Sequence, residues 1–226
     1  MHSSTMRSPT PSAAVWRTVV AVVAALAIVG AYAAPWLHYL CKPAATLSIA
    51  AMVLRLGAGA EPGYRRAIVA GLLLSTAGDV FLMLPGLFIP GLVAFLLAHI
   101  AYTVRLRQDA PWFASRRALA LTLGVGALMY TVLWLGGLPA GLRGPVAAYV
   151  VVIALMAAQA LGRASVRRDQ ASVLVAVGAC FFMLSDTLLA LNRFVTPLPM
   201  AQLGVLATYY AAQCLMVGGL IRSRPA

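Results

Sequence analysis

The sequence is poor in charge, and above all in acidic side chains. Only 10% of the 226 residues are charged and only five are Asp or Glu, whereas 62% are hydrophobic. An ordinary soluble domain is about 45–50% apolar and about 25% charged. The shortage of charge therefore excludes a soluble globular enzyme and a disordered chain, and it indicates a protein embedded in a membrane.

Cysteine and histidine are also scarce. The three cysteines (Cys41, Cys180 and Cys214) lie within or at the edge of apolar runs, which is typical of small buried hydrophobes rather than of a disulfide framework. Only His38 and His99 lie outside the N-terminal tail, so a zinc site would need both of them and an aspartate from separate helices. The sequence also lacks a Gly-rich phosphate loop and a Gly-x-Ser-x-Gly elbow. We therefore expect neither a metal nor an organic cofactor.

Lysine occurs once, as Lys42, but sixteen arginines give the chain a net charge of +12. The arginines form short clusters between apolar runs. Positive charge in loops orients membrane spans, so the basic balance is no evidence for nucleic-acid binding, and we expect no nucleic-acid partner.

Eight apolar runs follow a tail rich in Ser, Thr and Pro, and each is long enough to predict a transmembrane helix. The runs cover approximately Val15–Ala34, Trp36–Leu56, Ala67–Leu84, Leu87–Val104, Ala118–Leu135, Pro145–Leu161, Ala171–Leu191 and Leu198–Ile221. The expected fold is an all-α integral membrane protein, with a disordered tail over 1–14, one eight-helix domain over 15–221 and a cytoplasmic tail over 222–226. Pro43 and Pro90 are expected near helix starts, where a missing N–H does little harm.

The distribution of basic residues tests this count of spans. The two terminal tails and every second connection between the apolar runs, which fall on one side of the membrane, carry fourteen basic residues. The connections on the other side carry three, which are Lys42, Arg143 and Arg193. This asymmetry predicts eight helices with both termini in the cytoplasm. An alternative is that Arg7, Arg17 and the segment ending at 31–34 form a cleavable signal peptide. Because that run is long enough to span and leads directly into another, we expect it to be retained.

Two of the five acids, Asp79 and Asp186, lie inside apolar runs. Each comes five residues before the predicted outer end of its run, roughly 7–8 Å below that boundary. The other three (Glu61, Asp109 and Asp169) fall in predicted cytoplasmic loops, where solvated charge is expected. A buried intramembrane acid is costly unless it is paired, so Asp79 and Asp186 are candidates for one shared functional site. The alternative is a structural ion pair with Lys42 or Arg193.

The segments around these aspartates, 78–84 and 185–191, also resemble each other. The resemblance is compatible with a weak parallel repeat of two four-helix halves. Further polar residues recur at helical spacing and suggest a polar interior cavity. They are His38, Lys42 and Thr46; His99, Tyr102 and Thr103; Gln159; and Tyr209, Tyr210 and Gln213.

Several short motifs, in order, resemble a known family. They are Lys42-Pro43, Gly78-Asp79, Gly91-Leu92, Ala94-Phe95, Ala98-His99, Tyr102, Met156, Gln159-Ala160, Ser185-Asp186, residues 189–194 (LALNRF), Thr208-Tyr209-Tyr210 and Ala212-Gln213. On these residues the chain resembles the YhhN-like lysoplasmalogenases, which are multi-spanning membrane enzymes. One departure is Ala158, where the family often has an aromatic residue before the glutamine.

The resemblance implies hydrolysis of the vinyl-ether bond of a lysoplasmalogen to a fatty aldehyde and a glycerophospho-headgroup. It implies catalytic roles for Asp79 and Asp186, and substrate contacts from a further set of polar residues. That set is Lys42, His99, Tyr102, Gln159, Asn192, Arg193, Tyr209 and Gln213. The chemistry of the residues agrees, since one protonated carboxyl can protonate the vinyl carbon while an ionised one stabilises the resulting oxocarbenium ion and activates water.

Two other classes of function remain open at the level of sequence. Intramembrane Asp, Lys and His also serve as relays in proton-coupled transporters and lipid flippases, and polar residues can act only in helix packing. The expected partners are a lysophospholipid substrate and the surrounding lipid. The abundance of Arg and Ala over Lys suggests a GC-rich bacterial genome, and hence a bacterial plasma (inner) membrane.

Overall fold

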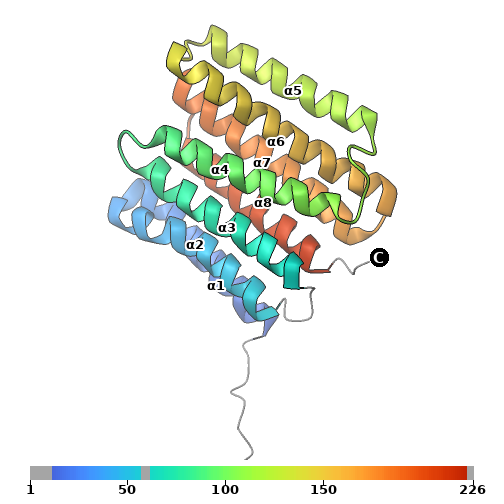
Figure 1. Ribbon diagram of the computed structural model, residues 1–226. Coiled ribbons are helices and arrows are strands. Elements are labelled where there is room, and N and C mark those ends of the chain that lie inside the picture. Colours follow the sequence, from blue (N-terminus) through green and yellow to red (C-terminus); the bar gives the residue numbers. More distant parts are fainter. Residues whose placement is uncertain (1–11, 57–61, 223–226) are drawn as a thin grey trace, which may run out of the picture.

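The described part of the chain forms a bundle of eight α-helices. The computed structural model describes residues 12–56 and 62–222 (Figure 1). The helices are α1 (Ala13–Ala33), α2 (Pro35–Leu56), α3 (Pro62–Met83), α4 (Phe88–Arg107), α5 (Arg116–Leu135), α6 (Ala140–Arg167), α7 (Gln170–Phe194) and α8 (Ala201–Arg222). Every predicted apolar run corresponds to one helix, so the all-α fold is confirmed.

Within the described residues, seven helices (α1 to α7) are long and apolar enough to cross a membrane. The chain is therefore an integral, multi-pass membrane protein. The eighth helix, α8, has 22 residues, which is about 33 Å of helix. It carries Gln202, Tyr209, Tyr210 and Gln213. The last three of these are buried, so their polar side chains face the interior of the bundle.

Some boundaries differ from the prediction for identifiable reasons. Helix α1 begins at Ala13, because the Ser12 hydroxyl accepts from the Val15 N–H and caps the first turn. Helix α6 extends from Ala140 to Arg167, well beyond its apolar run, with polar turns at both ends. Of the predicted tails, residues 1–11 and 223–226 lie outside the described residues, as does Glu61.

The expectation for Pro43 was wrong: it lies inside α2, eight residues beyond the helix start. It has no N–H to donate to the carbonyl of Tyr39, and membrane helices tolerate such a break where neighbouring helices satisfy the backbone. Pro90 is the third residue of α4, as expected.

Successive helices pack as antiparallel pairs, α1 with α2, α3 with α4, α5 with α6 and α7 with α8. Helix α4 also packs on α6, while α8 contacts α1 and α2, which joins the two halves. Figure 1 shows α1 and α5 at opposite edges of the bundle, and the start of α1 at the same end as the end of α8. That this end is cytoplasmic stays a prediction from the arginine distribution.

Candidate functional site

Asp79 on α3 is buried and held by three donors. Its carboxylate is 2% exposed, and the Lys42 ammonium lies 3.3 Å from Oδ1. The hydroxyls of Thr46 and Tyr209 both donate to Oδ2, at 3.1 and 2.8 Å. Lys42 and Thr46 are one turn apart on α2, while Tyr209 comes from α8. A buried carboxylate is tolerated only when a cation pairs with its charge and its oxygens accept hydrogen bonds. Both conditions are met here.

A chain of hydrogen bonds extends from Asp79 across α8 to α4. Gln213, one turn after Tyr209, donates from Nε2 to the Tyr209 hydroxyl at 3.3 Å. Its Oε1 accepts from the Tyr102 hydroxyl at 3.2 Å. Tyr102 and Gln213 are fully buried. Four of the residues proposed from the sequence (Asp79, Tyr209, Gln213 and Tyr102) therefore form one connected network.

Asp186 on α7 has a separate set of partners. The Tyr149 hydroxyl, from α6, donates to Oδ2 at 2.5 Å. The Nε2 atom of His99, from α4, lies 3.5 Å from the same oxygen and 2.9 Å from the Tyr149 hydroxyl. The side chain of Asp186 is 19% exposed, so it is more accessible than Asp79. Sequence reasoning did not single out Tyr149.

The two aspartate clusters adjoin through a wall of aromatic rings. Phe95 and Phe182 each pack against both His99 and Tyr209, with ring centroids 4.8–6.5 Å apart. Gly78 allows this close packing, since a Cβ there would lie 2.5 Å from the Phe95 ring. Among the described contacts, none joins the two carboxylates directly. The predicted single site is thus two neighbouring carboxylate centres.

The two centres are related by a constant offset of 107 residues. Asp79 corresponds to Asp186, and its partner Lys42 corresponds to Tyr149, the partner of Asp186. Tyr102 on α4 and Tyr209 on α8 are separated by the same interval. The parallel repeat stays a prediction, which these matched contacts support. The offset is also the signal that points to Tyr149.

Two pockets lie near the aspartates and share part of their lining. A largely apolar pocket between α4, α5, α6 and α7 is lined by Asp186, Tyr149 and Phe95, with aliphatic side chains around them. A polar pocket near the start of α2, the end of α7 and the start of α8 is lined by His38, Lys42, Asn192, Arg193 and Gln202. Leu82 and Leu189 line both pockets. Each of these leucines lies three residues after an aspartate, on the same side of its helix.

Other side chains of the polar pocket are held in defined positions. The guanidinium of Arg193 stacks over the rings of Phe88 and Phe194, 4.3 and 5.7 Å from their centroids. Asn192 accepts from the Leu198 N–H at 2.9 Å and so fixes the start of the α7–α8 connection. Of the two cations considered as ion-pair partners, it is Lys42 that pairs with an aspartate.

Gln159 is not brought together with the aspartates. It is fully buried on α6, ten residues or about 15 Å from Tyr149 along the helix. Its amide donates to the Pro111 carbonyl at 3.2 Å and accepts from the Phe113 N–H at 2.8 Å. Gln159 therefore holds the connection between α4 and α5.

Metal ligation has no geometric support among the residues described. No three His, Cys, Asp or Glu side chains in 12–56 and 62–222 lie close enough to hold a metal ion. His38 lies apart from His99, with its Nδ1 atom 2.9 Å from the Ala27 carbonyl.

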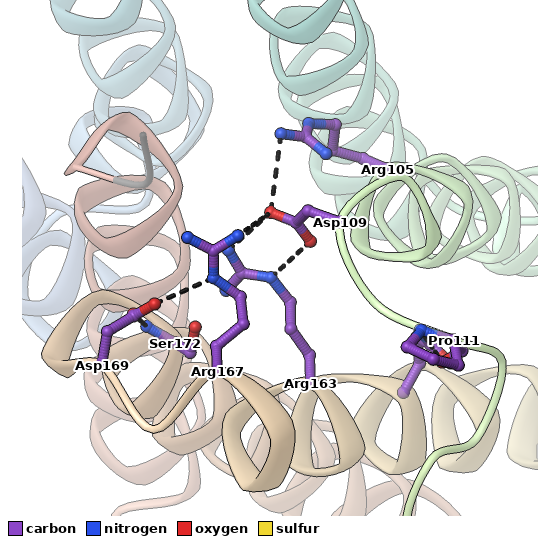
Figure 2. A network of polar contacts seen from close by, with 8 residues as sticks. Arg105, Asp109, Pro111, Arg163, Arg167, Asp169 and Ser172 are labelled. Carbon is purple, nitrogen blue, oxygen red and sulfur yellow. Dashed lines mark hydrogen bonds and ion pairs between the residues drawn. The ribbon is translucent and has the colours of Figure 1, made fainter. Parts of the chain in front are cut away.

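A second polar network lies at the opposite end of the bundle (Figure 2). Asp109 is only 9% exposed, and Arg163, which is fully buried, contacts both of its oxygens at 2.7 and 2.8 Å. Arg105 and Arg167 lie 4.0 and 3.5 Å from it. The expectation of a solvated Asp109 was wrong, because the ends of α4 and α6 enclose the loop that carries it. Asp169 remains more exposed and caps α7.

Comparison with known proteins then assigns the chain to a family. The profile of the YhhN family matches residues 37–220, which include both carboxylate centres. The chain belongs to the YhhN family. Its relatives include lysoplasmalogenase TMEM86B of Sus scrofa, 35% identical over 80% of this chain and 74% of the relative. Lysoplasmalogenase TMEM86A of Homo sapiens is 30% identical over 84% and 80% of the two chains.

A bacterial relative belongs to the same group. The lysoplasmalogenase of Mycobacterium bovis is 31% identical over 83% of this chain and 73% of the relative. No solved structure gives a significant match.

Proposed function

We propose that this YhhN-family protein is a lysoplasmalogenase, which hydrolyses the vinyl-ether bond of a single-chain ether lipid. The products are a fatty aldehyde and a glycerophospho-headgroup. The names of its relatives support the reaction class. The observation that carries the proposal is that a polar and an apolar pocket share Leu82 and Leu189, each one helical turn from an aspartate.

The two pockets match the two ends of a lysophospholipid. The alkenyl chain occupies the apolar pocket, and the phosphate lies among Lys42 and Arg193 in the polar pocket. The vinyl-ether bond joins these two parts of the lipid, so it lies where the two pockets share their lining. Asp186 lines the apolar pocket directly, and Lys42 connects the polar pocket to Asp79. Asn192 shapes the polar pocket, and His99 orients the Asp186 centre.

Asp186 is the proposed proton donor, because it lines the apolar pocket. Tyr149 and His99 contact its Oδ2, which leaves Oδ1 to carry the proton. Transfer of that proton to the vinyl carbon remote from oxygen converts the enol ether to an oxocarbenium ion. Water then adds to the carbon bonded to oxygen. The hemiacetal collapses to the aldehyde and the free hydroxyl of the glycerophospho-headgroup.

Asp79 is the proposed stabiliser of the cation and base for the water. Lys42 lies between it and the polar pocket, pairing with the carboxylate and lining the pocket at the same time. A bound phosphate attracts the ammonium and so frees the Asp79 charge to act on the oxocarbenium ion. Thr46, Tyr209, Gln213 and Tyr102 are positioning residues in this scheme, since they act through Asp79.

The test is aldehyde release from 1-alkenyl-glycerophosphoethanolamine by the purified protein in detergent. We expect Asp79→Asn and Asp186→Asn each to lower the rate about a hundredfold or more, the usual contribution of a general acid or base. Asp169→Asn is the matched control, because it removes an acid at the other end of the bundle. We expect it to keep the rate.

The outcomes separate the competing functions. Turnover in detergent without any gradient contradicts a transporter, whereas folded protein that releases no aldehyde contradicts the proposed reaction. If both Asp→Asn variants keep full activity, the two-aspartate mechanism is wrong even though the reaction stands. We further propose the bacterial plasma membrane as the location, on the Arg- and Ala-rich composition.

A further inference from the structure

A groove distinct from the two pockets runs along the outside of the bundle. It lies between α1, α2, α7 and α8 at the end where α1 begins and α8 ends. Its walls are mostly small or aliphatic, including Val20, Ala24, Met52 and Leu215. The groove exists because α1 touches α8 at far fewer positions than it touches α2.

Among the described residues that line this groove, the charged ones are two arginines at its mouth. Arg17, in the first turns of α1, and Arg222, the last residue of α8, are both exposed. No hydrogen bond or ion pair of either is found within the described part of the chain. Two cations that line one groove, with no carboxylate among its described lining residues, attract an anion. The groove is thus cationic at its mouth and apolar along its length.

The length of the groove matches one leaflet of a membrane. From Arg222 at the mouth to Tyr210 at the deep end are twelve residues of α8, or about 18 Å. Half of a bilayer's hydrocarbon core is about 15 Å. Gly218 leaves the groove open, because a Cβ there would meet nothing within 4 Å. An acyl chain fits along this space with its headgroup at the arginines.

We propose that this groove binds an anionic phospholipid of the leaflet at this end of the bundle, with the phosphate between Arg17 and Arg222. The positive-inside distribution predicts that this end is cytoplasmic, which is the face where anionic lipids attract basic residues. The N-terminal tail is a weaker occupant. Residues 1–11 contain only Met1 and Met6 as large apolar side chains.

The site also contacts the machinery around Asp79. Tyr210, at the deep end of the groove, donates from its hydroxyl to the Lys42 carbonyl at 3.3 Å. The ring of its neighbour Tyr209 lies 5.2 Å from the Tyr210 ring, and the Tyr209 hydroxyl donates to Asp79. The lipid therefore packs against the helix that positions the Asp79 centre, although its binding does not depend on the proposed reaction.

The experiment measures lipid binding directly. Delipidated protein in detergent is titrated with phosphatidylglycerol or with phosphatidylcholine of the same chains, and bound lipid is counted by native mass spectrometry. We expect one phosphatidylglycerol to bind preferentially. The Arg17→Gln, Arg222→Gln double variant should weaken it about twenty-five-fold, since each basic residue near a lipid headgroup contributes about fivefold. Gly218→Phe, which fills the groove, should abolish this binding.

Matched controls exclude non-specific effects. Arg117→Gln removes an exposed arginine of the same end that lies outside the groove, and Gly124→Phe adds a ring on α5 where a Cβ also meets open space. Both should bind lipid like the wild type. Equal binding of the two lipids, or unchanged binding in the double variant, overturns the proposal. If deletion of residues 2–11 creates binding that the full chain lacks, the tail is the occupant and the lipid assignment is wrong.

Discussion

Lys42 and Tyr149 occupy matched positions beside the two aspartates, but they bring different charges to them. Lys42 places an ammonium 3.3 Å from Asp79, whereas Tyr149 offers Asp186 a neutral hydroxyl. The two carboxylates therefore have unequal electrostatic surroundings. This inequality is what a division between acid and base requires, since identical carboxylates have no reason to take different roles.

Tyr149→Phe tests the Asp186 centre by removing one oxygen atom, that of the Tyr149 hydroxyl. The ring, which packs on His99, is kept, but the donor to Asp186 and the contact with His99 are lost. We expect the rate of aldehyde release to fall about tenfold or more, with a stability loss of about 1–2 kcal/mol. Rates in detergent and thermal unfolding check this.

Tyr130→Phe is the control for that variant. Its hydroxyl donates to the Arg143 carbonyl, away from both carboxylates. We expect a comparable small loss of stability and no change in rate. An equal fall in rate for both variants would show that the Tyr149 effect is structural.

The helices themselves were predictable from hydropathy, because a backbone in lipid must satisfy its own hydrogen bonds. Hydropathy does not predict how far a helix continues beyond its apolar run. Helix α6 continues to Arg167 because its last turns pack around Asp109, a contact that depends on tertiary structure. The same holds for Pro43, whose position inside α2 depends on neighbours that compensate for the lost hydrogen bond.

Asp169, the cap of α7, gives a pH-dependent contribution to stability. Partial burial alone would raise its pKa. The hydrogen bonds from Arg167 and Ser172 outweigh this and lower the pKa to about 2. A carboxyl with a lowered pKa in the folded state stabilises above its unfolded pKa near 4, and this stabilisation is lost as pH falls toward 2.

We therefore expect the wild type to unfold at higher temperature than Asp169→Asn at pH 6. Because the side chain is 38% exposed, the difference in free energy should be only about 0.2–1 kcal/mol. The difference should shrink between pH 4 and pH 2. Thermal unfolding of both proteins across that range is the measurement. A difference that stays constant, or grows on acidification, contradicts the role assigned to Asp169.

Seen as a whole, the molecule has polar centres at both ends of an apolar bundle. Asp79 and Asp186 lie near the ends of α3 and α7, whereas the Asp109 network lies at the ends of α4 and α6 (Figure 2). Sequence reasoning found Asp79 and Asp186 because each interrupts an apolar run. It missed Tyr149 and the burial of Asp109, because a pattern along one helix does not reveal which side chains a neighbouring helix brings to it.

Asp109→Asn tests the structural importance of the second network. The substitution leaves Arg163 buried without its carboxylate, and breaking a buried ion pair costs about 3–5 kcal/mol. We expect a large fall in unfolding temperature, with unchanged aldehyde release per folded molecule because the network lies far from both pockets. Asp169→Asn again provides the comparison, since that acid is more exposed. Equal stability of the two variants would contradict the assignment.

The matched positions of Lys42 and Tyr149 have a consequence for charge balance in the interior. If both halves had lysine at this position, the interior would bury two lysine–aspartate pairs with no net charge. The second half has Tyr149 there instead. Lys42 and the carboxylates of Asp79 and Asp186 therefore sum to one negative charge, which one further positive charge would balance. In the proposed mechanism, a proton on the Asp186 centre supplies that charge before the reaction, and the oxocarbenium ion supplies it afterwards. The proposed chemical step then moves one positive charge over a short distance, and the membrane interior gains none.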